Sequence, residues 1–173
     1  TSVIDKPTKV AEYIQVCRQM NIPILPPDIN KGEYGFSVSG GSILYALSAI
    51  KSVGRPVIEA IVAERKEHGE YLSVKNFIER NMEAVNKRAI ENFIKAGALD
   101  CLEGNRHQKM VVFGQIVDDI SRNKKQSMAG QLSLFDIASE DEKKEFEIRM
   151  PQAAEYPKEM ILTFEKEVLG IYL

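Results

Sequence analysis

The apolar residues in the central part of the chain recur at intervals of three and four, and this period limits the possible folds more than any other feature. It runs from Pro56 to about Asn123 and is typical of helices that bury one face. The same period occurs near the start, where Pro7 suits the first turn of a helix, and again after Pro157. The predicted helices cover about 7–20, 56–69, 73–80, 86–97, 105–123 and 157–173.

One region between the first two helices has a β pattern. The three prolines between 23 and 27 exclude a helix there. Two short runs, 34–38 and 42–47, flank the pair Gly40-Gly41, and paired glycines supply the positive φ angles of a tight hairpin turn. The predicted fold is therefore mainly α with a small β hairpin.

The charged residues exclude some classes of protein. The chain has 23 basic and 25 acidic residues, and its net charge of -2 does not fit a uniformly cationic coat on nucleic acid. The charges are unevenly placed, because residues 1–110 hold 15 basic and 13 acidic groups whereas 111–173 hold 8 and 12. Any contact with DNA is therefore expected to be local.

Cysteine use and hydropathy point to a reduced, cytoplasmic chain with no membrane partner. Cys17 and Cys101 form neither a disulfide framework nor a zinc cluster, since only His68 and His107 could add ligands. No apolar run approaches the roughly 20 residues of a spanning helix, and no signal segment opens the chain. The first residue is not Met, and the chain stops at Leu173 within an apolar helical pattern. We therefore expect a piece of a longer protein.

Residues 47–61 predict a helix-hairpin-helix. An apolar residue, a short Val53-Gly54 turn and a helix start follow one another there, with Ser52 in place of the usual first glycine. We expect Gly54 to have a positive φ, so that successive N–H groups and the next helix N-terminus face a phosphate. Such a contact is specific for duplex shape, not for bases. The predicted DNA-binding residues of this hairpin are Lys51, Ser52, Val53, Gly54 and Arg55.

A second, shorter match occupies residues 94–99. It repeats the order of apolar residue, Lys, small residue and Gly, 44 positions after Ile50. Two hairpins in tandem would grip two phosphates across a groove. The alternative is that Gly54 forms a plain turn and Gly97 only ends a helix. The predicted DNA-binding residues of the second hairpin are Lys87, Arg88, Lys95, Gly97 and Arg106.

The stretch 123–147 is polar and strongly charged, so it is expected to be a flexible linker. Its one apolar island is the sequence QLSLF at 131–135. An exposed apolar cluster in a polar linker indicates a partner pocket, although such a cluster can also fold back as a short strand. The peptide resembles the Gln-Leu-Ser/Asp-Leu-Phe signature by which bacterial proteins dock on the sliding clamp. The clamp-binding residues implied by it are Gln131, Leu132, Ser133, Leu134 and Phe135.

Segments along the whole chain resemble one family. They lie at 10–14, 17–18, 24–30 (ILPPDIN), 49–54, 86–88, 94–100 and 169–173 (LGIYL). Together they resemble the region downstream of the fingers in the alpha subunits of bacterial DNA polymerase III, the C-family DNA polymerases. The resemblance implies a helix-hairpin-helix DNA-binding domain and an internal clamp-binding peptide.

The resemblance also implies four parts with different roles. They are the end of the fingers region with the hairpin (1–48), a tandem helix-hairpin-helix domain (49–122), a flexible linker with the clamp-binding peptide (123–156) and a helix leading to a barrel domain outside this chain (157–173). The implied partners are primer-template duplex DNA, the sliding clamp (the beta subunit) and the rest of the polymerase III holoenzyme.

The resemblance implies that the parent protein is a DNA-directed DNA polymerase, which would use Mg²⁺ on a palm preceding Thr1. No catalytic residue, metal site or cofactor is expected in this chain, since the adjacent pair Asp118-Asp119 falls on a solvated helix face. Two alternatives remain. One is a clamp-associated repair or recombination protein with the same hairpins, and the other is an interaction module without a DNA role.

Overall fold

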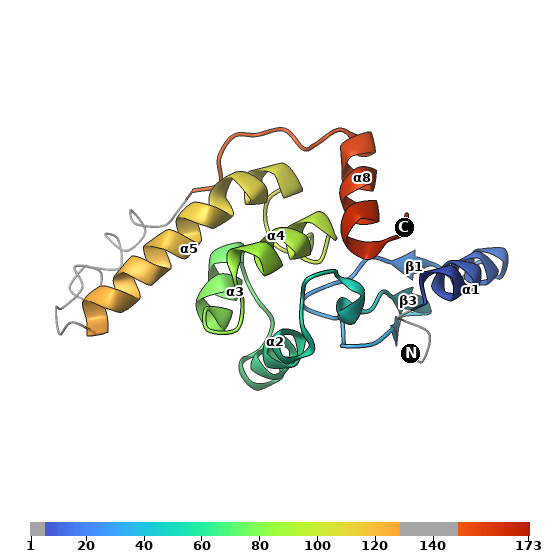
Figure 1. The fold of residues 1–173 in the computed structure, drawn as a ribbon, viewed down its shortest axis with the longest axis horizontal. Helices are drawn as coiled ribbons and strands as arrows, with labels where there is room; N and C mark the ends of the chain where they lie inside the picture. The colour runs from blue at the N-terminus through green and yellow to red at the C-terminus, as the bar shows by residue number, and fades with distance from the viewer. Residues whose placement is uncertain (1–5, 129–148) are drawn as a thin grey trace.

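The computed structural model describes residues 6–128 and 149–173, which form a mainly helical protein with a small β-sheet (Figure 1). This confirms the predicted fold class. The elements, in chain order, are α1 (Pro7–Gln19), β1 (Ile24–Leu25), β2 (Ser37–Ser39), β3 (Ser42–Leu44), a 3-10 helix (Leu47–Ala49), α2 (Arg55–His68), α3 (Val74–Asn81), α4 (Lys87–Lys95), α5 (Arg106–Met128) and α8 (Lys158–Leu169).

The helices begin where the sequence predicts, because their caps are local. The side-chain oxygen of Ser73 accepts a hydrogen bond from the backbone N–H of Asn76 at 3.0 Å, at the start of α3. Asn86 accepts one from Ala89 at 2.8 Å, at the start of α4. Both are ordinary N-cap bonds, which satisfy an N–H that has no partner inside the helix.

The β structure differs from the predicted hairpin. The turn is as expected, with φ of 56° at Gly40 and 80° at Gly41, but the strands are shorter and β1 pairs in parallel with β3 to give the sheet order β1-β3-β2. The carbonyl of Pro23 accepts the N–H of Ile43 at 2.9 Å. A proline can accept a sheet hydrogen bond but cannot donate one, so the prolines that exclude a helix permit this edge strand.

One hydrophobic core joins elements from both ends of the chain. The rings of Tyr71, Phe77 and Phe93 pack edge to face in its centre, with centroids 5.1 and 5.9 Å apart. Helix α8 packs on α4 and buries Val168 and Leu169 in the same core. The structure therefore places the last helix, which the sequence analysis assigned as a lead into the next domain, within the hairpin domain itself.

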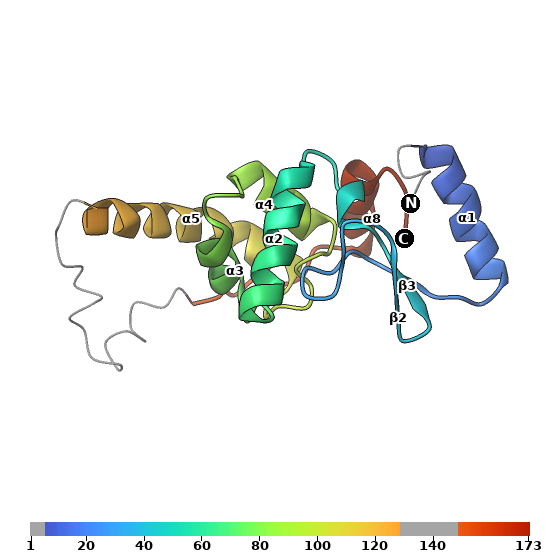
Figure 2. The ribbon, with the colours of Figure 1, turned by 90° about the horizontal axis from the view of Figure 1, so that it is seen from below.

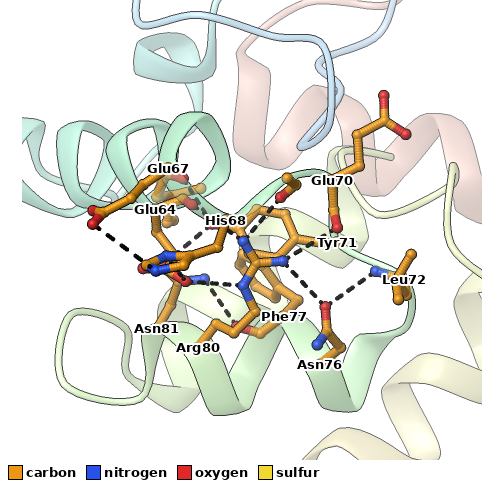
Figure 3. Close-up of polar contacts among 12 residues, drawn as sticks. Glu64, Glu67, His68, Glu70, Tyr71, Leu72, Asn76, Phe77, Arg80 and Asn81 are labelled. Atoms are coloured by element: carbon orange, nitrogen blue, oxygen red, sulfur yellow. Dashed lines mark hydrogen bonds and ion pairs between the residues drawn. The ribbon is translucent and has the colours of Figure 1, made fainter.

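Helices α2 and α3 are locked together by the side chain of Arg80 (Figure 3). Its guanidinium lies over the ring of Tyr71, 4.4 Å from the centroid, and pairs with Glu64 at 2.9 Å. It also donates to the carbonyl of Gly69 at 2.9 Å, just beyond the end of α2. Cations near the carbonyl end of a helix are favourable, so these contacts fix the direction of α2. The N-terminus of α2 directly follows the first predicted helix-hairpin-helix loop.

The segment between β1 and β2 is bound to the helices by the side-chain amide of Asn30 and the guanidinium of Arg65. The amide of Asn30 forms two hydrogen bonds with the backbone of Tyr71, at 2.8 and 3.0 Å. Buried Arg65 donates to the carbonyls of Ile29 and Gly32. The packing therefore continues across the predicted boundary at residue 48.

Helix α5 reaches away from the body of the molecule, on the side opposite α1 (Figures 1 and 2). It continues to Met128, past the predicted end near 123, and Lys124 pairs with Glu83 at 2.5 Å. After the undescribed residues, the chain returns along the start of α5, where Asn105 donates to the carbonyl of Ala153 at 2.9 Å. The structure thus differs from the predicted linker 123–156 at both its ends.

Candidate nucleic-acid interface

The first hairpin loop, residues 50–54, is held by groups from other helices. The N–H of Lys51 donates to the carbonyl of Val168 at 2.8 Å, and the side-chain amide of Asn92 donates to the carbonyl of Lys51 at 2.7 Å. Because the backbone is fixed from α4 and α8, the side chains of Lys51 and Ser52 are left exposed. Val53 turns inward and is buried in the core.

The left-handed residue of this loop is Ser52, not Gly54. Ser52 has a φ of 61°, whereas Gly54 has a φ of -74° and stands as the extended N-cap of α2. The expectation of a positive φ at Gly54 is therefore wrong. Gly54 has no side chain to cap α2, and Pro56 has no N–H. The N–H groups in the first turn of α2 therefore receive no side-chain cap, and they lie beside the loop.

Arg55 is exposed but already has partners. It pairs with Glu59 one helical turn later at 2.7 Å, and its guanidinium lies 5.0 Å from the centroid of the Tyr34 ring. The hydrogen bond and the charge of Glu59 raise the pKa of Arg55. Lys87 on α4 is similarly exposed and pairs with Asp118 at 2.7 Å, which accounts for one member of the Asp118-Asp119 pair.

The second hairpin loop, residues 96–105, is held from inside. Gly97 has the expected left-handed conformation, with a φ of 81°. A Cβ at this position would overlap Nη2 of Arg106 and lie 3.0 Å from Oδ2 of Asp100. Glycine is therefore required twice, by backbone conformation and by the close approach of a side chain.

Arg106 and Lys109, at the start of α5, are buried and support this loop. Arg106 pairs with Asp100 at 2.8 Å and with Glu165 of α8 at 3.0 Å. Burial alone would lower its pKa, but the bonds to these two carboxylates raise it. Lys109 is fully buried and donates to the carbonyls of Leu99 at 2.6 Å and Leu102 at 3.0 Å. In this structure neither cation faces solvent, so a phosphate contact by Arg106 stays a prediction that its present partners oppose.

Residues of both hairpins meet at one pocket of about 250 Å³. Lys51 and Ser52 come from the first hairpin loop, and Arg88 and Lys95 come from α4, the first helix of the second hairpin. The sequence analysis treated these as two separate phosphate contacts. The structure brings four of its ten predicted DNA-binding residues to the wall of a single pocket, which we call the interhairpin pocket.

The cations of the interhairpin pocket are not equally available. Neither Lys51 nor Arg88 forms an ion pair with another described residue, and both are exposed. Lys95 is only 11% exposed and lies between Glu91 and Glu167, each at 3.0 Å. Desolvation acts to lower the pKa of Lys95, but the two carboxylates raise it.

Four residues of the pocket wall were not predicted as part of the site, namely Glu91, Asn92, Glu167 and Val168. Glu91 is visible as an i,i+4 partner of Lys95, a spacing that commonly forms ion pairs on a helix. Asn92 and Glu167 carry no such signal, since they act on residues 41 and 72 positions away. The packing of α4 on the first hairpin loop places Asn92 in the site, and the packing of α8 on α4 places Glu167 and Val168 there.

His107, near the start of α5, packs against the returning chain. Its ring contacts the carbonyl of Ala154 at 2.8 Å and stacks on Tyr156.

Among residues 6–128 and 149–173, no group of three or more His, Cys, Asp or Glu side chains is placed to bind a metal ion. No helix in the described part of the chain has the length and hydropathy to cross a membrane. The predicted clamp-binding peptide, 131–135, lies outside the described residues.

Known proteins resemble this chain over nearly all of its length. It is 38% identical to DNA polymerase III subunit alpha of Chlamydia pneumoniae over 167 residues, which are 95% of this chain and 14% of that protein. It is 37% identical to the alpha subunit of Vibrio cholerae, over all of this chain and 15% of that protein. It is also 37% identical to the alpha subunit of Thermus aquaticus, over 95% of this chain and 13% of that protein. The chain thus spans only about one seventh of the length of these relatives.

A family model described as a helix-hairpin-helix motif matches residues 21–109. That range includes both hairpin loops and every wall of the interhairpin pocket except α8. The predicted resemblance is confirmed by both comparisons, and the chain belongs to the helix-hairpin-helix family, in the form of the segment found in DNA polymerase III alpha subunits.

Proposed function

We propose that this chain is part of the catalytic alpha subunit of a bacterial replicative DNA polymerase and that it binds the backbone of duplex DNA. The observation that carries the DNA contact is the interhairpin pocket, where Lys51 and Arg88 are exposed and have no carboxylate partner among the described residues. Similarity to polymerase III alpha subunits supports the same role.

The pocket suits one phosphate group better than a base. Lys51 and Arg88 supply charge, and the Ser52 hydroxyl supplies a hydrogen bond from the same wall. Contacts to backbone phosphate carry no direct sequence information, so binding is expected to be independent of base sequence. With about one phosphate charge neutralised in the pocket, the logarithm of the affinity should fall with the logarithm of salt with a slope of about -1.

The DNA contact is tested with a double variant in which both Lys51 and Arg88 are replaced by Ala. We expect duplex affinity, measured by fluorescence anisotropy at low salt, to fall about 30-fold, because each of the two lost contacts costs on the order of 1 kcal/mol. Lys124→Ala is the control, since it removes an exposed cation of α5 that pairs with Glu83 and does not line the pocket. Equal affinities for the double variant and the control would contradict the DNA contact.

We further propose that residues 131–135 dock on the sliding clamp. The support is the match of all five residues to the clamp-binding signature. Burial of Leu132, Leu134 and Phe135 would contribute roughly 1.5–3 kcal/mol each, less the costs of ordering and association. The expected contact is weak and reversible, and it becomes effective when both proteins are held on one DNA molecule.

Clamp docking is tested by replacing Leu134 and Phe135 with Ala and measuring binding to the purified clamp by surface plasmon resonance. We expect binding to be lost. Ser133→Asp is the control, because the signature accepts either residue at that position. Unchanged binding of the Leu134/Phe135 variant would remove the peptide from the interface.

The rest of the proposed function concerns the parent protein. DNA contact and clamp docking in one segment would lengthen the time for which a polymerase stays at a primer end. DNA synthesis, its Mg²⁺ requirement and assembly into a holoenzyme in the bacterial cytoplasm are proposed for the whole subunit. The described residues do not fit the metal, since they include no group of acidic or other ligands placed to hold it.

A further inference from the structure

Glu167, on α8, lies on the wall of the interhairpin pocket and pairs with one of its cations. Its Oε1 atom is 3.0 Å from Nζ of Lys95. The second carboxylate on Lys95 belongs to Glu91, also at 3.0 Å. Lys95 therefore has both of its carboxylate partners inside the site that is proposed to receive a phosphate.

The backbone on each side of Glu167 is held in place. Two residues earlier, the buried carboxylate of Glu165 pairs with Arg106 at 3.0 Å. One residue later, the carbonyl of Val168 accepts the N–H of Lys51 at 2.8 Å. The position of Glu167 at the pocket therefore follows from the docking of α8, whereas its own side chain is 55% exposed and can change rotamer at little cost.

A carboxylate in this position acts against a phosphate in two ways. It repels the incoming negative charge, and it occupies the ammonium group of Lys95, which is too buried to reach past it. A phosphate that takes Lys95 as a third cation, beside Lys51 and Arg88, must displace Glu167. The pocket thus has two cations that are available to a phosphate, Lys51 and Arg88, and a third, Lys95, that is paired with carboxylates.

We propose that Glu167 lowers the affinity of the interhairpin pocket for DNA phosphate by holding Lys95, which keeps the contact readily reversible as duplex passes. This inference rests on the proposed DNA binding and adds to it the residue that sets its strength. It makes α8 a regulatory element, since any rearrangement that moves α8 also changes the charge of the pocket.

The test compares Glu167→Gln with Glu159→Gln in duplex binding by fluorescence anisotropy. Glu159 is an exposed acid of the same helix that has no ion pair with a described residue, so both variants change the net charge equally. We expect Glu167→Gln to bind about two- to fivefold more tightly than the wild type, as the loss of one ion pair allows. Equal affinities for the two variants would overturn the proposal.

A double-mutant cycle with Lys95→Gln shows whether Glu167 acts through Lys95. If it does, Glu167→Gln gains less than half as much affinity in the Lys95→Gln background as in the wild type. A full gain in that background would contradict this route.

These outcomes are distinct from failure of the proposed function. Wild-type protein that shows no salt-dependent duplex binding would refute the DNA contact itself. Wild-type binding that depends on Lys51 and Arg88, together with no difference between the Glu167 and Glu159 variants, would refute only the role of Glu167.

Discussion

The two hairpins of this protein have similar sequences but use their cations in opposite ways. In the first, Lys51 points to solvent, and the loop backbone is held by Asn92 and Val168 from other helices. In the second, Arg106 and Lys109 are buried and hold the loop from within. A basic residue beside a hairpin therefore indicates a phosphate contact only where something else supports the backbone.

The difference has a simple physical cause. A loop between helices leaves carbonyl groups without partners, and each must be satisfied by water or by another donor. In the second loop Leu99 and Leu102 are buried, so the ammonium of Lys109 takes the place of water at their carbonyls. The first loop is at the surface, where its side chains remain available for a ligand.

The largest expected effect contrasts the two hairpin glycines. Gly97→Ala should destabilise the protein by about 2–4 kcal/mol, because Ala resists the left-handed backbone and its Cβ would displace the buried Arg106 guanidinium. Gly54→Ala should cost less than about 1 kcal/mol, as expected for an N-cap with ordinary φ. Urea unfolding followed by circular dichroism measures both. Equal losses would show that the two loops are equally constrained.

A second comparison replaces the two lysines. Lys109→Met should destabilise the protein by about 1–3 kcal/mol, because it leaves the buried carbonyl of Leu102 without a donor and removes one of the two donors to the carbonyl of Leu99. Lys51→Met, at an exposed position, should change stability by less than about 0.5 kcal/mol. Thermal unfolding measures the difference. A Lys109→Met variant as stable as the wild type would show that water can replace the ammonium group.

The third prediction concerns the helix starts. The carboxylate of Glu155 accepts hydrogen bonds from the N–H groups of Arg106 and His107 at the start of α5, whereas α2 has no side-chain cap. Desolvation acts to raise the pKa of Glu155, but these backbone bonds lower it below 4.5. Its stabilisation is therefore present above pH 4.5 and is lost as the pH falls through the lowered value.

Glu155→Gln should accordingly reduce stability at neutral pH by about 0.5–1 kcal/mol. It should also reduce the loss of stability between about pH 5 and pH 3. Melting temperatures over that range measure both effects, with Glu159→Gln as the exposed control. An acid limb identical to that of the wild type would show that Glu155 does not act as the cap.

The smallest expected effect is at Ser52. Ser52→Gly should stabilise the protein by about 0.5 kcal/mol, because glycine adopts a φ of 61° without strain but loses more chain entropy on folding. Differential scanning calorimetry would resolve this change. A loss of stability instead would mean that the Ser52 side chain contributes more to the loop than its conformation costs.

Much of the fold could be predicted because its signals are local. The caps at Ser73 and Asn86 and the Gly40-Gly41 turn each depend on residues within a few positions. Strand β1 could not be predicted, since two residues beside a proline become a strand only by pairing with β3, about 19 positions away. The candidate site was predicted in part: Lys51, Ser52, Arg88 and Lys95 line the pocket, while Arg106 is buried.

The helix starts, the tight turn and the segments that resemble a polymerase III alpha subunit can be identified from local sequence, because periodicity, caps and short motifs are properties of neighbouring residues. Which cations are free depends on the packing of distant helices. The docking of α8 on α4 pairs Glu167 with Lys95 and Glu165 with Arg106. Electrostatic effects depend on distance and burial rather than on order along the chain, so Lys51 and Arg88 are left exposed at the pocket, whereas Arg106 and Lys109 are internal supports of the second loop.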